Sequence, residues 1–148
     1  MKVDFGKLKA DVDDVFCRII KGTIPARIVF RDAVSLAFLD RRPVFLGHTL
    51  LIPITHYETL EDLPFEFVGP LFSNAKRISV AVRKAVGADG TFLGINNRVS
   101  QSVPHLHIHI VPRKMGDGLR GFFWPRQKYE SEDQEIQIQK AIEKELST

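Results

Sequence analysis

Three of the five histidines in this chain alternate with apolar residues in one short stretch. Residues 105–111 read His-Leu-His-Ile-His-Ile-Val. Strict alternation of this kind predicts a β-strand, on which every second side chain lies on the same face. We therefore expect His105, His107 and His109 to line one face of a sheet, while the leucine and isoleucines between them face a core.

Two kinds of chemistry can use such a row of imidazoles. One is metal binding, but the outer two histidines of a strand lie about 13 Å apart, whereas Zn–N bonds are only about 2.0–2.1 Å long. All three therefore do not bind one ion. The other is nucleophilic attack on a phosphate by the central imidazole, with its neighbours holding phosphate oxygens. Three half-exposed histidines without a function are the plainer alternative, which this clustering disfavours.

The remaining hydrophobic pattern predicts an α+β fold with a mostly antiparallel, five-stranded sheet. A short helix from Asp14 ends at Gly22, a long amphipathic helix spans 66–86, and a C-terminal helix follows Ser131. We expect the regular part of the long helix to start at or just before Pro70, because proline is tolerated in a first turn. The predicted strands are 28–30, 34–39, 49–53, 91–95 and 105–111.

Composition narrows the class of protein. A chain of 148 residues suits one domain, and its net charge of +3 fits a small anionic ligand but is too weak to indicate nucleic acid. The lone Cys17 excludes an internal disulfide. No apolar run is long enough to span a membrane, and the first residues lack an apolar signal core, so we expect a soluble cytoplasmic protein.

The triad stretch resembles the signature of the histidine-triad family of nucleotide hydrolases and transferases. Segments at 24–29, 36–40, 47–53, 94–97 and 101–104 resemble the same family in the same order. The resemblance covers residues 14–113, which we expect to form the HIT domain. It leaves an N-terminal extension, 1–13, and a C-terminal segment, 114–148. The resemblance also implies a homodimer made by the long helix and the fourth strand, with a purine nucleotide as the ligand.

The resemblance implies roles for the triad and the loop before it. His107 is expected to attack the α-phosphate, with its other ring nitrogen protonated and held by a backbone carbonyl. His109 is expected to donate to phosphate oxygens, and His105 to order the loop and the nucleophile. Ser102 would bond the leaving group or a phosphate oxygen, and Gln101 would orient the water or the loop. No cofactor is required.

The same resemblance implies substrate contacts. Asp40 would accept hydrogen bonds from the ribose hydroxyls, although an aspartate that merely starts a turn is an alternative. Arg41 departs from the apolar residue usual in the family and could touch a base or a phosphate. His48 is expected to be structural. The residues that would wall the base pocket are Phe16, Ile19 and Phe38, and an asparagine at Asn96 or Asn97 would bond the phosphate or ribose.

A zinc site is an alternative use of the residues around Cys17. Many family members carry Cys-x-x-Cys here, but this chain has Asp14 in place of the first cysteine. Asp14, Cys17, His56 and His105 would be the ligands, because carboxylate oxygen also binds zinc. The favoured interpretation is a buried free thiol that packs as a small hydrophobic side chain.

The function predicted is a hydrolase that acts at a nucleoside α-phosphate, on dinucleoside polyphosphates or nucleoside phosphoramidates. A phosphorylase or nucleotidyltransferase of the same family, and a nucleotide-binding regulatory protein, remain alternatives. A metal-dependent oxygenase is weaker, because no carboxylate is placed to complete its metal site. The aromatic residues Phe122, Phe123 and Trp124 either stack a base or attach the C-terminal segment to the body or a partner subunit.

Overall fold

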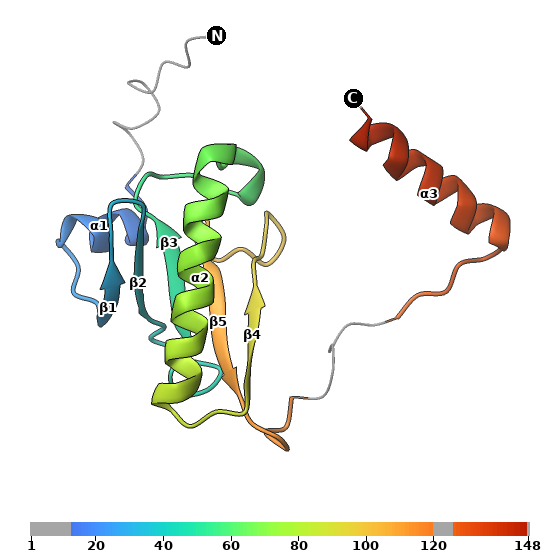
Figure 1. Cartoon of the computed structure of the whole chain (residues 1–148). Coiled ribbons are helices and arrows are strands. Elements are labelled where there is room, and N and C mark those ends of the chain that lie inside the picture. Colours follow the sequence, from blue (N-terminus) through green and yellow to red (C-terminus); the bar gives the residue numbers. More distant parts are fainter. Residues whose placement is uncertain (1–12, 120–125, 148) are drawn as a thin grey trace, which may run out of the picture. The chain divides into compact units, whose positions relative to one another are not determined.

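A computed structural model describes residues 13–119 and 126–147 of the chain (Figure 1). The chain divides into two compact units, one ending at Asp117 and the other beginning at Gly118. The first unit holds a five-stranded sheet, and all four pairings in it are antiparallel. Its strands, in the order in which they lie side by side, are β1 (Ile28–Arg31), β2 (Ser35–Leu39), β3 (Thr49–Pro53), β5 (Ile108–Arg113) and β4 (Gly90–Gly94).

Two helices of the first unit pack on this sheet. The long helix α2 (Phe65–Ala85) lies along one face (Figure 1), where its apolar stripe meets Ala37, Leu51, Ile108 and Ile110. The short helix α1 (Val15–Lys21) supplies Phe16 and Ile19 to a second cluster, which holds the alternate residues Leu36, Phe38, Leu50 and Ile52. Because neighbouring strand residues face opposite sides, β5 presents Ile108 and Ile110 to α2 and His109 to the α1 side. The predicted α+β fold is confirmed.

The last strand begins three residues later than the alternation predicts. β5 starts at Ile108, so His105 and His107 lie in the segment that leads into it. The ladder to β3 ends at the pair Leu51 and Ile108, because Pro53 beyond it has no N–H to donate. The backbone N–H of Leu106 instead donates to the carbonyl of Tyr57, over 2.6 Å.

The long helix begins earlier than expected, at Phe65, and contains Pro70. A proline in a helix lacks one N–H and crowds the residue before it. That residue is Gly69, which has no Cβ for the proline ring to crowd. The helix therefore passes through Pro70 to end at Ala85.

The second unit contains α3 (Glu132–Leu146), whose first turn is capped by the hydroxyl of Ser131. Its apolar face is exposed, with Ile142 at 56% and Leu146 at 81% exposure. Within the described ranges, no helix combines the length and apolar character needed to cross a membrane. The aromatic residues 122–124 lie outside the described ranges. The domain boundaries expected after residues 13 and 113 stay a prediction.

Candidate active site

A pocket opens on the α1 side of the sheet, next to the triad. Its volume is about 1110 Å³, which is ample for a nucleotide-sized ligand. Its apolar wall is formed by side chains of α1, β2 and β3, among them Phe16, Ile19, Phe38 and Leu50. The Phe16 ring lies edge-on to the imidazole of His107, with ring centroids 5.2 Å apart, so the pocket wall contacts the triad directly.

His107 has one ring nitrogen committed and the other free. Nδ1 lies 2.7 Å from the carbonyl oxygen of His105. Since a carbonyl only accepts, this nitrogen carries the proton. The neutral imidazole then keeps a lone pair on Nε2, which is the form that a nucleophile needs. The side chain is only 3% exposed, so the tautomer is held within a packed environment.

His48 fixes the tautomer of His109. The backbone N–H of Val44 donates to Nδ1 of His48 over 3.1 Å, which places the single proton of the neutral ring on Nε2. That Nε2 lies 3.0 Å from Nδ1 of His109 and donates to it. His109 must then carry its own proton on Nε2. It therefore presents an N–H donor while remaining uncharged.

The electrostatic surroundings keep these rings neutral. Burial, together with the neighbouring His107 and His48, lowers the pKa of His109 to about 4. Burial likewise lowers the pKa of His48, although the carboxylate of Asp40 opposes the shift. Both are uncharged near neutral pH.

His48 was predicted to be structural, and its bond to the Val44 amide fits that expectation. Its contact with His109 was not foreseen. No local pattern could have revealed it, since 61 residues separate the two histidines.

Asp40 lies at the exit of β2, on the rim of the pocket. One carboxylate oxygen accepts the backbone N–H of Arg42 over 2.8 Å, as in a turn-starting aspartate. The other oxygen lies 3.7 Å from Nε2 of His48 and faces the triad side. The turn therefore orients the carboxylate, and the two sequence-based interpretations are compatible.

The loop before the triad is tied to the segment after β3. Gln101 donates from Nε2 to the carbonyl of Glu58 over 2.6 Å, and its Oε1 accepts the N–H of Arg98. Asn97 accepts the N–H of Leu60 through its side chain. These bonds hold the backbone of Arg98 at a positive φ of 69°. Gln101 and Asn97 thus shape the loop, while Ser102 lines the pocket. Asn96 lies just after β4, but no polar contact of its side chain adds to this network.

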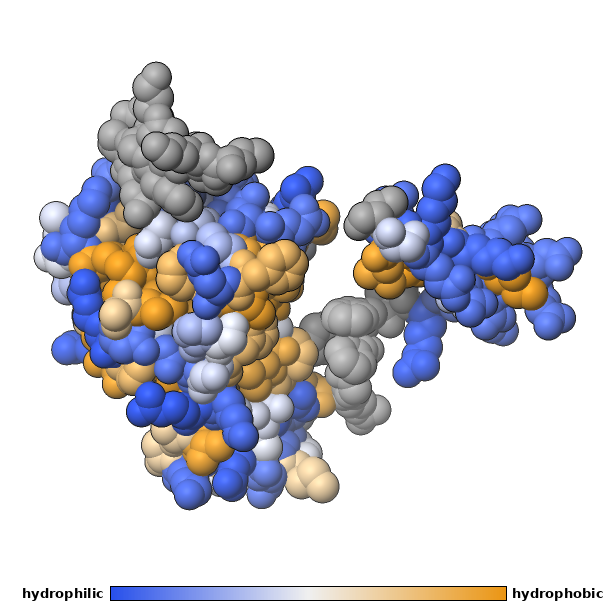
Figure 2. Space-filling model, turned by 45° about the horizontal axis from the view of Figure 1, so that its top comes forward, coloured by the Kyte–Doolittle hydropathy of each residue, from blue (hydrophilic) through white to orange (hydrophobic). Residues whose placement is uncertain are grey.

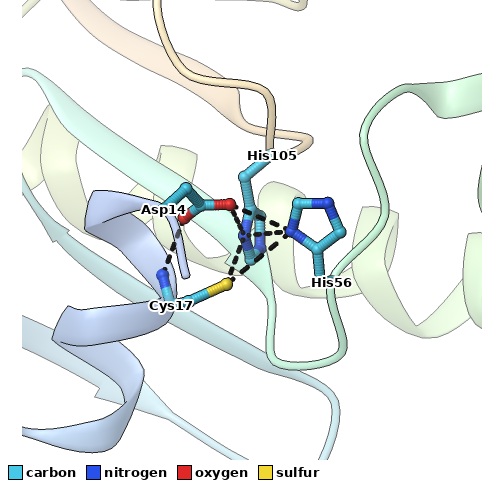
Figure 3. Close-up of side chains that lie close together, drawn as sticks. All are labelled: Asp14, Cys17, His56 and His105. Carbon is cyan, nitrogen blue, oxygen red and sulfur yellow. Dashed lines mark hydrogen bonds and ion pairs between the residues drawn. The ribbon is translucent and has the colours of Figure 1, made fainter. Parts of the chain in front are cut away.

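A second cluster lies behind His105, where side chains from three segments point toward one another (Figure 3). Asp14 and Cys17 come from the start of α1, His56 from the loop after β3, and His105 from the segment before β5. Nδ1 of His105 lies 3.3 Å from Oδ2 of Asp14 and 3.7 Å from Sγ of Cys17. Nδ1 of His56 lies 3.0 Å from the same oxygen and 3.7 Å from the same sulfur.

This cluster fits a tetrahedral metal ion. Nε2 of His105 donates to the carbonyl of Pro53 over 2.9 Å, so its Nδ1 is a lone pair that faces the Asp14 carboxylate, another acceptor. A cation between them would satisfy both. Zinc bonds of about 2.0–2.3 Å place tetrahedral ligand atoms about 3.3–3.8 Å apart. Five of the six separations between these four ligand atoms run from 3.0 to 3.7 Å, close to that range. The sequence had favoured a plain buried thiol here.

Asp14 and Cys17 differ in protonation inside the cluster. Burial works against ionisation of Asp14, but the amide of Cys17 and the nearby His105 outweigh it and lower the pKa of this carboxyl. Burial, and then the Asp14 carboxylate, raise the pKa of the Cys17 thiol. A metal ion would have to displace the thiol proton.

Asp40, His48 and His109 also bring three potential ligand atoms within 4.8 Å of one another. The hydrogen bond from Val44 to Nδ1 of His48 argues against a metal there, because it leaves the proton on the nitrogen that would bind the ion. The two clusters therefore differ in chemistry. One offers lone pairs, and the other is already joined by a proton.

Comparison with known proteins agrees with this geometry. The model of the HIT domain matches residues 21–116, well over half of the chain. The chain belongs to the histidine-triad (HIT) family. An uncharacterized HIT-like protein of Methanocaldococcus jannaschii is 43% identical over 106 residues, which are 70% of this chain and 81% of that protein.

Two named enzymes are also similar to this HIT protein. An adenylylsulfatase of Arabidopsis thaliana is 42% identical over 80% of this chain, which spans 60% of the plant protein. An adenosine 5′-monophosphoramidase of Schizosaccharomyces pombe is 35% identical over 90% of this chain and 96% of the yeast protein.

Solved structures share the fold. A HIT family protein of Bacillus subtilis has a TM-score of 0.80 and 34% identity, covering 90% of this chain and 96% of that one. A Zn-bound histidine triad family protein of Mycobacterium smegmatis has a TM-score of 0.68 and 37% identity, covering 86% of this chain and 96% of that one.

Proposed function

We propose that this HIT protein hydrolyses nucleotides at the α-phosphate through a covalent intermediate on His107. The observation that carries the proposal is the bond of 2.7 Å between Nδ1 of His107 and the carbonyl of His105. In the neutral ring this bond leaves the lone pair on Nε2, beside a pocket large enough for a nucleotide. A histidine in this form is a competent nucleophile without metal assistance.

In the first step, Nε2 of His107 forms a bond to phosphorus. The bond from phosphorus to the leaving nitrogen or bridging oxygen breaks, and its electron pair stays with the leaving group. That group takes a proton from solvent, relayed by the hydroxyl of Ser102 on the pocket wall. The ring of His107 becomes cationic, and the His105 carbonyl that it already contacts stabilises this charge.

The neighbouring histidine offers a hydrogen bond to the phosphate without carrying charge itself. Nε2–H of His109, fixed by His48, donates to a non-bridging oxygen. In the second step, water attacks phosphorus, the N–P bond breaks, and its electron pair returns to Nε2. The water releases a proton to solvent. The products are a nucleoside monophosphate and the free enzyme in its starting tautomer.

The substrate class follows from the pocket and the relatives. The apolar slot accepts a flat base, and Asp40 on the rim is suited to accept the ribose hydroxyls. We propose nucleoside phosphoramidates and dinucleoside polyphosphates as substrates. The relatives named adenylylsulfatase and adenosine 5′-monophosphoramidase support a nucleoside phosphate carrying a small leaving group.

Product analysis tests this function. Wild type and His107→Ala are incubated with adenosine 5′-phosphoramidate or diadenosine tetraphosphate, with and without inorganic phosphate, and products are separated by chromatography. Hydrolysis gives AMP regardless of phosphate, and His107→Ala gives none. A phosphorylase would give ADP only when phosphate is added. Nucleotide binding without turnover would instead favour a regulatory protein.

We further propose that Asp14, Cys17, His56 and His105 hold a structural zinc ion. The solved Zn-bound relative supports metal binding within the family. Bound there, the ion would join α1, the loop after β3 and the segment before β5, and so brace the backbone of His105. The chemistry proposed at phosphorus is performed by the histidines and needs no metal.

We also propose a homodimer through α2 and β4. β4 is the last strand in the sheet order, so its outer edge is open among the described residues. Figure 2 shows apolar surface left exposed on the visible face. Phe72 and Val80 of α2 and Leu93 of β4 are 39%, 42% and 40% exposed. Light scattering should give twice the monomer mass, and Leu93→Lys should shift it toward the monomer.

A further inference from the structure

One wall of the pocket carries an arginine that the proposed chemistry does not use. Arg41 follows Asp40 in the turn after β2, and its Nη2 donates to the carbonyl of Pro25 over 3.3 Å. Both residues line the pocket, together with Arg27 and Arg42. Among the described pocket arginines, Arg41 is the one whose guanidinium makes a hydrogen bond, although its side chain is exposed. We propose that Arg41 reads the base and makes the pocket selective for 6-oxopurine nucleotides, guanine and hypoxanthine, over adenine.

The strand order shows which part of a nucleotide Arg41 meets. His109 lies on β5 and Phe38 on β2, while Pro25 and Arg27 lead into β1, at the far edge of the sheet. Neighbouring strands are about 4.8 Å apart, so β1 lies roughly 14 Å from β5. A nucleotide whose phosphate faces His109 therefore extends its ribose past Asp40 and its base across β2. The guanidinium of Arg41, held at Pro25, lies at the base end.

The chemistry of the guanidinium favours one kind of purine. Arginine has five N–H donors and no acceptor, and the bond to Pro25 uses one donor. Guanine and hypoxanthine present two acceptors, O6 and N7, on one edge, and arginine pairs with both at once. Adenine presents N7 beside an amino group, so a donor would face a donor. An apolar residue at this position would not distinguish guanine or hypoxanthine from adenine.

Turnover of three substrates tests this inference, which rests on the proposed function. Wild type, Arg41→Leu, Arg41→Lys and Arg31→Leu are assayed with the 5′-phosphoramidates of guanosine, inosine and adenosine. Arg31 is the matched control, because it also donates to a backbone carbonyl, that of Ile20, but does not line the pocket. Binding of GMP, IMP and AMP to each protein is measured by calorimetry, which reports base preference without turnover.

For wild type, we expect kcat/KM for guanosine and inosine to exceed that for adenosine about fivefold or more, as for a bidentate arginine pair. Arg41→Leu should bring the ratio of kcat/KM between the 6-oxopurine substrates and the adenosine substrate near one. The change should come from a higher KM for the guanosine and inosine substrates rather than from kcat, because the base contact is the same in ground and transition states. Arg41→Lys should keep at most part of the preference, and Arg31→Leu all of it.

Several results would overturn the inference while leaving hydrolysis intact. These are a wild-type preference for adenine, a ratio that Arg41→Leu does not change, or inosine behaving like adenosine, which would point to the guanine amino group instead. If nothing is turned over but the monophosphates bind in the expected order, Arg41 selects the base and the proposed hydrolysis is wrong. If no nucleotide binds, both proposals fail.

Discussion

His48 donates its Nε2 hydrogen to Nδ1 of His109 over 3.0 Å, and the backbone of Val44 sets the direction of that bond. A residue outside the triad therefore decides which nitrogen of His109 carries the hydrogen. His48 acts as a positioning residue, since it reaches the substrate only through His109. Its importance rests on orientation rather than on charge, because burial lowers its pKa.

Replacing His48 tests this positioning role. His48→Phe removes the donor and frees His109 to adopt the other tautomer. We expect kcat to fall about tenfold or more with little change in KM, as for one lost hydrogen bond. His48→Gln can still donate from Nε2, so it should recover a large part of the rate. Equal losses in both variants, matched by lower thermal stability, would indicate a packing role instead.

Replacing Asp40 tests the ribose contact. Asp40→Asn keeps the size of the side chain but exchanges one acceptor oxygen for a donor. Wild type should prefer a ribonucleoside phosphoramidate over its 2′-deoxy form, and the variant should lose most of that preference through a higher KM for the ribonucleotide. Steady-state kinetics with the two substrates measures the ratio. A preference that survives the substitution would leave Asp40 with its turn-forming role alone.

Zinc content tests the second cluster. Purified protein should contain about one zinc per chain by elemental analysis, and Asp14→Ala and Cys17→Ser should each lose most of it. Removing the ion with a chelator should lower Tm and speed the reaction of the buried Cys17 thiol with a thiol reagent, because bound metal protects the thiolate and stabilises the folded state against opening. Asp13→Ala is the matched control, since Asp13 pairs with Arg18 at the surface. Protein that never binds zinc would leave Cys17 a buried thiol.

Stability should fall as the pH drops through the range in which unfolded histidine takes up a proton. The pKa of His109 moves from 6.5 in the unfolded chain to about 4 in the folded one. Between these values the unfolded state binds more protons, so the free energy of unfolding rises with pH. The contribution is complete above pH 6.5 and is lost toward pH 4, amounting to at most about 3 kcal/mol.

Urea unfolding of metal-free protein at several pH values between 7 and 4 measures this slope. His109→Asn is the informative comparison, because it removes the titrating ring and should flatten part of the curve. The carboxylates Asp14 and Asp32 also have lowered pKa values, but theirs start from 3.8 and act below this window. A slope that is the same in the variant would place the pH dependence in other groups.

Much of the fold could be predicted from local patterns. The alternation at 105–111 gave the right face for each histidine, because the period of a strand is independent of where its ladder begins. It could not reveal that β5 starts at Ile108, which depends on Pro53 of a different strand. The same limit applied to Pro70, which α2 accommodates because Gly69 precedes it.

The sequence could name candidate residues for the site, but not the contacts between them. The resemblance named Phe16, Phe38, Asp40 and Ser102, and all four line one pocket. The link from His48 to His109, and the convergence of Asp14 with His105 over 91 residues, are tertiary contacts that no spacing encodes. Tautomers are likewise set by partners such as the carbonyl of His105, which only the folded chain brings into place.

Intact-protein mass spectrometry can detect the bond that Nε2 of His107 is proposed to form with phosphorus. The protein is mixed briefly with adenosine 5′-phosphoramidate and quenched, in wild type and in His107→Ala. We predict a transient mass gain of one adenylyl group in wild type, located on His107 by peptide mapping and absent from the variant. Turnover without any adduct at the shortest mixing times, or an adduct that persists in His107→Ala, would contradict the account.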